Sequence, residues 1–229
     1  ISATALGFVL PRGLREQVLA SAVDTTTLVQ YLAFGARRRA INGQLSELIE
    51  HVLEEGHYEK IHILGYSFGS LIAIDALFPP FEKPTPGFAK VDTLVTLGCP
   101  VDAVRAFLPR YFVDRVRLPD VPRVWTNIYI PADVLASNFR NDPLPEKATF
   151  NVLGRPRGEQ VQDEVLPDNK LYVLAPGSTH VQLRDYFGWL FLTGLNAHNL
   201  YWGDIASDSD SLLHVVRTLY DPAEAPKAA

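Results

Sequence analysis

The chain has 229 residues, of which 47% are hydrophobic and 21% charged, so it can bury a substantial core as one globular domain. Its net charge is −5 and it has no long basic run, which argues against nucleic acid as a partner, because nucleic-acid binding requires a clustered positive surface. The single cysteine, Cys99, excludes an intramolecular disulfide and slightly favours a reducing compartment such as the cytoplasm, without fixing the location.

The first part of the chain is predicted to be mainly helical. The helical prediction covers residues 12–55. Residues 6–10 before them could form a short strand. One apolar residue returns at nearly every helical turn: Ile41, Leu45, Leu48, Ile49 and Val52. Gly56 follows this amphipathic stretch and suits the left-handed conformation that often ends a helix.

The apolar period then changes from that of a helix to that of a strand. Residues 60–65 predict a short apolar strand, and residues 71–77 predict a helix that is apolar on nearly all sides and therefore buried. That helix must end before Pro79, because proline cannot continue it. Between the two elements lies the pentapeptide Gly65-Tyr66-Ser67-Phe68-Gly69.

Three more strands are predicted along the remaining chain, at residues 91–97, 124–130 and 171–174. Because helices or long crossovers separate the strands, we expect an α/β fold with a parallel sheet covered on both faces. The polar residues 138–170 predict a surface excursion, and residues 209–219 predict a terminal helix. We expect one domain over residues 1–221, followed by a disordered tail at 222–229.

The pentapeptide fits the pattern Gly-x-Ser-x-Gly, in which a serine occupies the tip of a sharp strand-to-helix turn. Such a turn lifts the Ser67 hydroxyl clear of the sheet, and Gly65 and Gly69 are expected to relieve steric crowding around it. The backbone N–H of Phe68 would then point at a developing oxyanion. An ordinary glycine-rich turn is the competing interpretation, while the absence of Gly-x-Gly-x-x-Gly argues against a dinucleotide loop.

Four segments resemble the α/β-hydrolase superfamily, and in particular its serine esterase and lipase-like members. They are residues 63–70, 96–100, 125–133 and 197–202. The resemblance implies a three-layer fold with a mostly parallel sheet flanked by helices, here without the usual N-terminal strands. It also implies a catalytic triad in the chain order serine, acid, histidine, which places Ser67, Asp133 and His198 in these roles.

The residues themselves leave rivals for two of these positions. Asp133 follows the third strand, at the sheet edge where ligands gather in open α/β folds, but Asp102 follows the second strand and Asp142 is a weaker candidate. His198 lies beyond the fourth strand, and His180 competes with it as the base. The remaining histidines are interpreted as surface or structural residues: His51, His57, His62 and His214.

We therefore predict an enzyme that hydrolyses carboxylic esters through an acyl-enzyme on Ser67, with a small-molecule or lipid ester as substrate. No cofactor is expected, and no metal, because the histidines lack ligand spacing. The alternative is a non-catalytic hydrolase-fold module used for binding or assembly, since no second oxyanion donor is recognisable. The chain begins at Ile1 and contains no methionine, so we expect a further N-terminal segment that completes the sheet and the oxyanion hole. The oligomeric state is not predicted.

Overall fold

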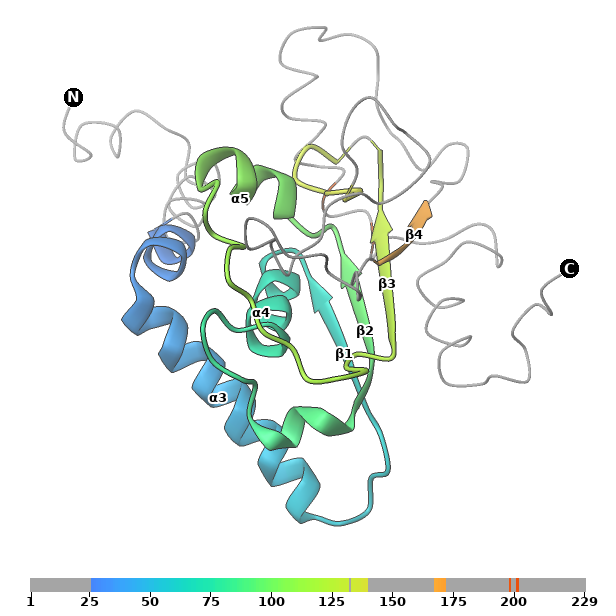
Figure 1. The fold of residues 1–229 in the computed structure, drawn as a ribbon. Helices are drawn as coiled ribbons and strands as arrows, with labels where there is room; N and C mark the ends of the chain where they lie inside the picture. The colour runs from blue at the N-terminus through green and yellow to red at the C-terminus, as the bar shows by residue number, and fades with distance from the viewer. Residues whose placement is uncertain (1–25, 132, 140–166, 172–197, 199–200, 202–229) are drawn as a thin grey trace, which may run out of the picture. The chain divides into compact units, whose positions relative to one another are not determined.

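The structure is a computed structural model that describes residues 26–131, 133–139, 167–171, 198 and 201 (Figure 1). The chain divides into two compact units, Ile1–Leu48 and Ile49–Ala229, and the sheet belongs to the second unit. Several predicted features lie outside the described residues: the strand at 6–10, the helix at 209–219 and the tail at 222–229. The prediction of one domain over residues 1–221 stays a prediction.

The helical prediction for the first part of the chain is confirmed where the structure describes it. Residues 26–33 are helical, and α3 spans Gly35–Glu54. Gly56 has a φ of 71°, and its N–H donates to the carbonyl of Leu53 over 3.0 Å. Glycine adopts this left-handed conformation without steric cost, so the predicted end of the helix is also confirmed. Among the helices that the structure describes, none combines the length and apolarity needed to cross a membrane.

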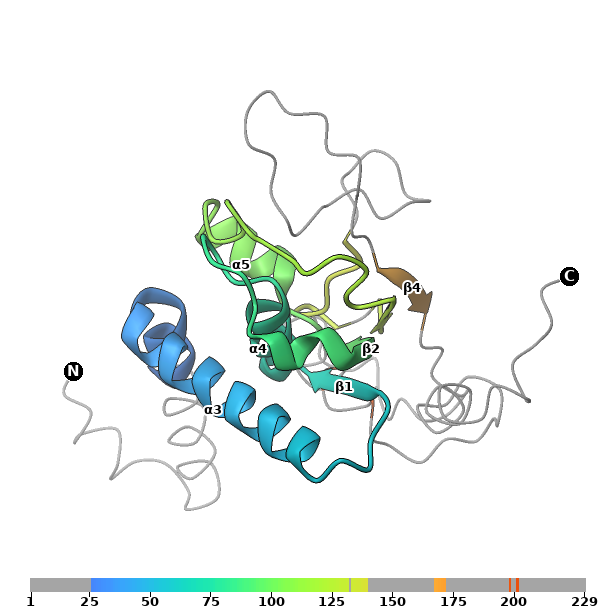
Figure 2. The ribbon, with the colours of Figure 1, turned by 60° about the horizontal axis from the view of Figure 1, so that its bottom comes forward.

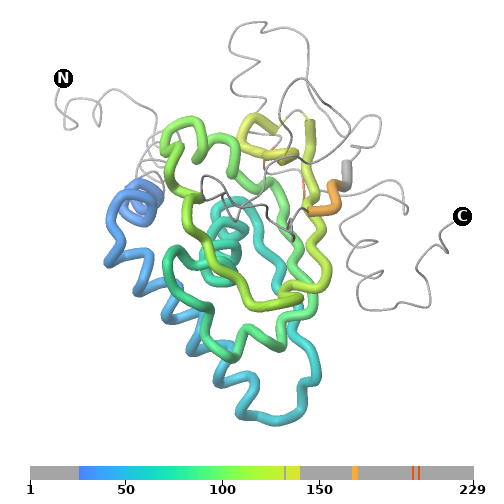
Figure 3. Tube along the Cα trace, viewed as in Figure 1, coloured from blue at the N-terminus to red at the C-terminus, as the bar shows by residue number. Residues whose placement is uncertain are grey.

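Within the described residues of the second unit, the central element is a four-stranded parallel sheet (Figure 1). Its strands follow the chain order and are β1 (Ile61–Tyr66), β2 (Val91–Leu97), β3 (Val124–Tyr129) and β4 (Asp168–Leu171). Because all four run in one direction, the turns that follow β1, β2 and β3 meet at one edge of the sheet (Figure 3). The predicted α/β class with a parallel sheet is therefore present.

Apolar burial on β2 and α4 holds this sheet together. The helix α4 (Phe68–Leu77) lies against β1 and β2 and buries most of its side chains, as predicted from its apolar sequence (Figure 2). Leu71 and Ile74 on α4, and Leu94 and Leu97 on β2, are fully buried. Each such side chain contributes about 1.5–3 kcal/mol, so α4 and the strands beneath it form a rigid platform.

The structure differs from the prediction at three elements. β4 begins at Asp168, within the polar segment that predicted a surface excursion, and residues 172–174 of the predicted strand lie outside the described residues. Asn169 of β4 accepts a hydrogen bond from Asn127 Nδ2 over 3.0 Å, so side-chain pairing compensates for weak strand propensity. Two short helices were not predicted, η1 (Pro86–Lys90) and α5 (Val101–Phe107).

Candidate functional site

Ser67 lies between the end of β1 and the start of α4, in a conformation that few side chains adopt. Its φ is 53° and its ψ is −125°. Its N–H donates to the carbonyl of Leu97 over 2.8 Å, which ties the turn to the neighbouring strand. A strained residue of this kind persists only where rigid elements on both sides enforce it, and β1 and α4 do so here. The sharp strand-to-helix turn expected from the pentapeptide is therefore present.

The two glycines of the motif differ in what they contribute. A Cβ on Gly65 would lie 2.6 Å from Ser70 Cα and 2.7 Å from Ser70 N, so only glycine fits there. A Cβ on Gly69 would meet no atom within 4 Å outside its own helix. The expectation that Gly69 also relieves crowding is wrong, because its Cα faces open space at the first turn of α4.

Ser70 fastens this turn to the sheet. Its side chain is fully buried, and its Oγ donates to the carbonyl of Gly65 over 2.7 Å. The same Oγ accepts the N–H of Leu97 over 3.3 Å, so one hydroxyl joins β1, α4 and β2. Sequence reasoning missed this role, although a serine on an otherwise apolar, buried helix is a signal that its hydroxyl has internal partners.

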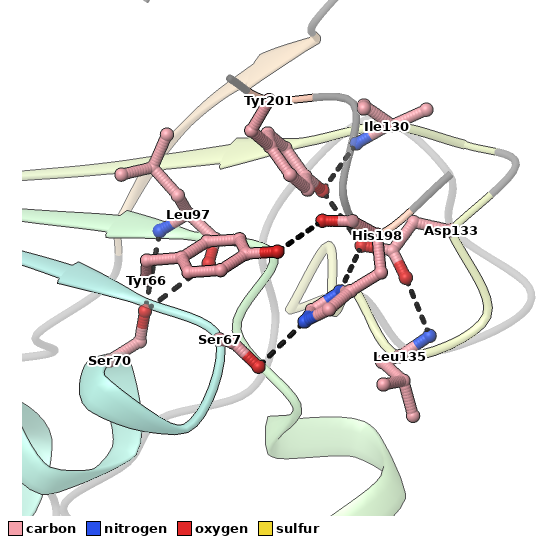
Figure 4. A network of polar contacts seen from close by, with 9 residues as sticks. All are labelled: Tyr66, Ser67, Ser70, Leu97, Ile130, Asp133, Leu135, His198 and Tyr201. Atoms are coloured by element: carbon pink, nitrogen blue, oxygen red, sulfur yellow. Dashed lines mark hydrogen bonds and ion pairs between the residues drawn. The ribbon is translucent and has the colours of Figure 1, made fainter. Parts of the chain in front are cut away.

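A chain of hydrogen bonds runs from Ser67 through His198 to Asp133 (Figure 4). Ser67 Oγ lies 2.6 Å from His198 Nε2, and His198 Nδ1 lies 2.8 Å from Asp133 Oδ2. An ionised carboxylate only accepts hydrogen bonds, so the Nδ1 proton points to Asp133 and Nε2 is left to accept from the serine hydroxyl. The exposed fraction is 4% for Asp133 and 8% for His198, which keeps bulk water from competing for these bonds.

The turn that follows β3 presents the Asp133 carboxylate. The N–H of Asp133 donates to the carbonyl of Ile130 over 3.0 Å, which closes this turn. Leu135 N donates to Asp133 Oδ1 over 2.9 Å, and the hydroxyl of Tyr201 donates to Oδ2 over 3.0 Å. With His198 as a third donor, three hydrogen bonds fix the orientation of the carboxylate and replace the water contacts that it loses on burial.

The rival candidate for the acid, Asp102, forms hydrogen bonds with Ser137 and Arg105. Its Oδ2 accepts the hydroxyl of Ser137 over 2.6 Å, and its Oδ1 lies 3.4 Å from Arg105 Nη1. Ser137 N also donates to the carbonyl of Cys99 over 2.7 Å, so Asp102 helps to hold the segment that carries Asp133. His198 is thus brought to Asp133. The other rivals, Asp142 and His180, lie outside the described residues.

Tyr66, the residue before the serine, holds His198 from a second side. Its ring stacks on the imidazole with a centroid separation of 5.2 Å and an interplanar angle of 24°. Its hydroxyl donates to the carbonyl oxygen of His198 over 2.5 Å (Figure 4). These contacts restrain both the ring and the backbone of His198. The variable position of the pentapeptide gave no signal of this role.

Gly98, directly after β2, leaves the space in which these groups meet. Its φ is 55°, and a Cβ there would lie 2.9 Å from Tyr201 Cε2, 3.0 Å from His198 Cε1 and 3.2 Å from Asp133 Oδ2. Any side chain would therefore displace the histidine, the aspartate or the tyrosine. A glycine at the carboxyl end of a central strand is the sequence signal that could have identified this position.

Phe68 is the first residue of α4, so its N–H lies at the positive end of that helix. Its role as an oxyanion donor stays a prediction. Burial raises the pKa of the Cys99 thiol well above its ordinary range, so Cys99 stays protonated and is a poor nucleophile. Within the described part of the chain, no group of three or more His, Cys, Asp or Glu side chains could hold a metal ion.

Comparisons with protein-family models, with curated proteins and with solved structures each found no match to this chain.

Proposed function

We propose that the protein is a serine hydrolase of the α/β-hydrolase type that cleaves carboxylic esters through an acyl-enzyme on Ser67. The observation that carries this proposal is the continuous hydrogen-bond chain from the Ser67 hydroxyl through His198 to Asp133. A serine, an imidazole and a carboxylate in this sequence of contacts form the arrangement that activates a hydroxyl for acyl transfer. The strained turn that carries Ser67 and the parallel sheet beneath it support the same assignment.

In the first half of the reaction, Ser67 Oγ attacks the ester carbonyl carbon while its proton passes to His198 Nε2 over the 2.6 Å contact. Asp133 stays ionised and stabilises the imidazolium through Nδ1. The carbonyl oxygen becomes an oxyanion, for which the N–H of Phe68 at the start of α4 is a suitable donor. When the tetrahedral intermediate collapses, the alcohol leaves with the proton from His198.

In the second half, water replaces the alcohol. His198 Nε2 takes a proton from water as the oxygen attacks the acyl carbon, and then returns that proton to Ser67 Oγ as the acid leaves. Atoms and charge balance without a cofactor. The substrate class is a small-molecule or lipid ester, and the complete fold is proposed to be the three-layer arrangement in which helices cover both faces of the sheet.

The experiment is labelling with a fluorophosphonate, which reacts readily only with an activated serine hydroxyl. We expect the wild-type chain to be labelled and Ser67→Ala to lose labelling. Ser46→Ala is the matched control, because Ser46 lies on α3 and its hydroxyl donates to the carbonyl of Asn42 over 3.0 Å. Equal labelling of the wild type and Ser67→Ala would overturn the nucleophile. A folded wild type without any labelling would favour the non-catalytic binding module.

The base is tested by comparing His198→Ala with His180→Ala in the same assay. Loss of the base should slow labelling by about 10³-fold or more, because the serine hydroxyl then keeps its proton. We expect this loss in His198→Ala, whose imidazole touches Ser67 Oγ. If His180→Ala alone abolished labelling, the assignment of the base would be wrong.

A further inference from the structure

A buried phenol at Tyr201 completes the site beyond the three residues of the hydrogen-bond chain. Its side chain is fully buried. The hydroxyl donates to Asp133 Oδ2 over 3.0 Å and accepts the N–H of Ile130, also over 3.0 Å (Figure 4). Ile130 directly follows β3, so the phenol connects the carboxylate to the end of a central strand. Both hydrogen-bonding capacities of this hydroxyl are therefore used inside the protein.

The same carboxylate oxygen serves Tyr201 and the histidine. Asp133 Oδ2 accepts from His198 Nδ1 over 2.8 Å as well as from the phenol. The ring of Tyr201 meets the imidazole edge to face, with centroids 6.3 Å apart and planes at 85°. The missing Cβ of Gly98 provides room for this ring, since a Cβ there would lie 2.9 Å from Tyr201 Cε2. The phenol is thus held in one place by contacts on several sides.

We propose that Tyr201 is a positioning residue for the hydrolytic site, acting through the Asp133 carboxylate to set the direction and the basicity of His198. This inference rests on the proposed function. Two donors share Oδ2, so the phenol takes part of the hydrogen-bonding capacity that the imidazolium would otherwise receive. Tyr201 therefore limits how strongly His198 holds its proton, which allows the proton to pass on to the leaving alcohol.

The direction of the effect follows from the groups that face His198. Among the described residues these are Asp133, Ser67 and the phenols of Tyr66 and Tyr201, and Asp133 is the one ordinarily charged group. Burial, followed by the charge of Asp133, raises the pKa of the Tyr201 hydroxyl well above its ordinary range, so it remains a donor at working pH. Removing the hydroxyl leaves Oδ2 to the imidazole alone, which strengthens the remaining hydrogen bond from the imidazolium.

The test compares Tyr201→Phe with Tyr111→Phe. Tyr111 is the matched control because its hydroxyl also donates to a carboxylate, that of Asp75. Asp75 lies eight residues after Ser67 along α4, about 12 Å away at the rise of an α-helix. Nitrogen-15 NMR of the labelled imidazole follows the titration of His198 directly, and the pH profile of kcat/KM for a chromogenic ester follows its effect on the reaction.

We expect the pKa of His198 and the acidic limb of kcat/KM to move upward by about half a unit in Tyr201→Phe. We also expect kcat to fall about tenfold with KM nearly unchanged, because the carboxylate loses a fixed direction. Tyr111→Phe should leave the imidazole titration in place. An unchanged or lowered pKa of His198 in Tyr201→Phe, or the same shift in Tyr111→Phe, would overturn the inference.

A second variant keeps the test decisive if Tyr201→Phe does not fold. Replacement of Tyr201 by 3-fluorotyrosine retains the ring and makes its hydroxyl a stronger donor, so the pKa of His198 should fall. A rise or no change would contradict the role of the phenol. The imidazole titration needs no turnover, so it decides the inference even where fluorophosphonate fails to label the wild type. In that case the proposed function fails separately.

Discussion

Two buried carboxylates of this protein, Asp133 and Asp75, each accept the hydroxyl of a tyrosine, yet they stand in different surroundings. Asp75 lies on α4 and pairs with Arg115 at 2.5 Å, with both side chains fully buried. The guanidinium also donates to the carbonyl of Phe78 over 2.8 Å and to that of Tyr111 over 3.0 Å. Its charge is permanent, so the pair joins α4 to the segment around residue 115 and moves no proton.

The partner of Asp133 is an imidazole, a side chain that can accept and release a proton. Its second nitrogen faces the hydroxyl of Ser67, a residue with positive φ. Burial and a tyrosine donor are common to both carboxylates and therefore do not mark a functional site. The distinguishing feature is a partner that can transfer a proton and that also contacts the hydroxyl of Ser67.

The largest effect is expected on the rate of reaction, from a substitution of the carboxylate that contacts His198. Asp133→Asn keeps the shape of the side chain but presents an amide to His198, which favours the wrong tautomer of the imidazole. We expect kcat to fall about 10⁴-fold, as such a change does in serine hydrolases, while the melting temperature changes little. Steady-state kinetics and a thermal melt of the same sample check both parts. A loss of less than tenfold would show that the carboxylate is not the acid of the site.

Asp75→Asn should have the opposite profile. Removing the charge leaves the guanidinium of Arg115 buried without its counter-ion, which typically costs about 3–5 kcal/mol. We expect the free energy of unfolding, measured by urea denaturation, to fall by that amount. Fluorophosphonate labelling of the folded fraction should proceed at the wild-type rate. Slow labelling of a stably folded Asp75→Asn would contradict the distinction between the two carboxylates.

The two glycines beside Ser67 test how the turn that carries this serine is held. Gly65→Ala places a methyl group 2.6 Å from Ser70 Cα, so the turn must shift and we expect a loss of about 1–3 kcal/mol in stability together with slower labelling of Ser67. Gly69→Ala meets no neighbouring atom and lies in a helix, so it should stabilise the protein by up to about 1 kcal/mol. Equal effects of the two changes on unfolding would refute this account of the turn.

A third carboxylate, Asp92 at the start of β2, forms an exposed ion pair with Arg123. Its substitution is expected to have the smallest effect on stability. Hydrogen bonds from Arg123 at 2.9 Å and 3.0 Å are the main cause that lowers the pKa of Asp92 well below its ordinary range. A carboxyl group with a lowered pKa in the folded state stabilises above its unfolded pKa, and this contribution is lost as the pH falls. Solvent screens the exposed Arg123, so the gain is small.

Asp92→Asn should therefore lower the melting temperature slightly near neutral pH and leave it unchanged in strong acid, where the wild-type carboxyl group has taken up its proton. Thermal melts of both proteins across the acidic range measure the difference. A gap between the two melting temperatures that widened as the pH fell would contradict the sign of this linkage.

Local pattern was sufficient to predict the elements nearest to the serine. The apolar strand β1, the pentapeptide and the buried helix α4 follow one another along the chain, so their order and their turn are local properties. β2 was predicted with the observed bounds because it is apolar and buried on both faces. β4 was misplaced because its residues are polar, and the bond between Asn127 and Asn169 joins positions far apart in the sequence.

The supporting residues of the site could not be predicted in the same way. Asp102 was a rival candidate for the acid because it follows a strand. Its hydrogen bond to Ser137, which the sequence did not indicate, gives it a supporting role in the segment that carries Asp133. Gly98 and Tyr201 matter through atoms that come together in three dimensions, and the segments that contain them did not indicate these contacts. Sequence patterns thus indicate which residue types can react, while long-range packing decides which side chains hold them.

The proposed activation of Ser67 can be observed by peptide mass spectrometry of the wild-type chain after fluorophosphonate treatment. Tryptic cleavage after Lys60 and Lys90 releases residues 61–90, because the bond between Lys83 and Pro84 resists the protease. This peptide contains both Ser67 and Ser70, and fragmentation separates the two positions. We predict one adduct, on Ser67. An adduct on Ser70 or on another serine, or a folded protein without an adduct, would contradict the account.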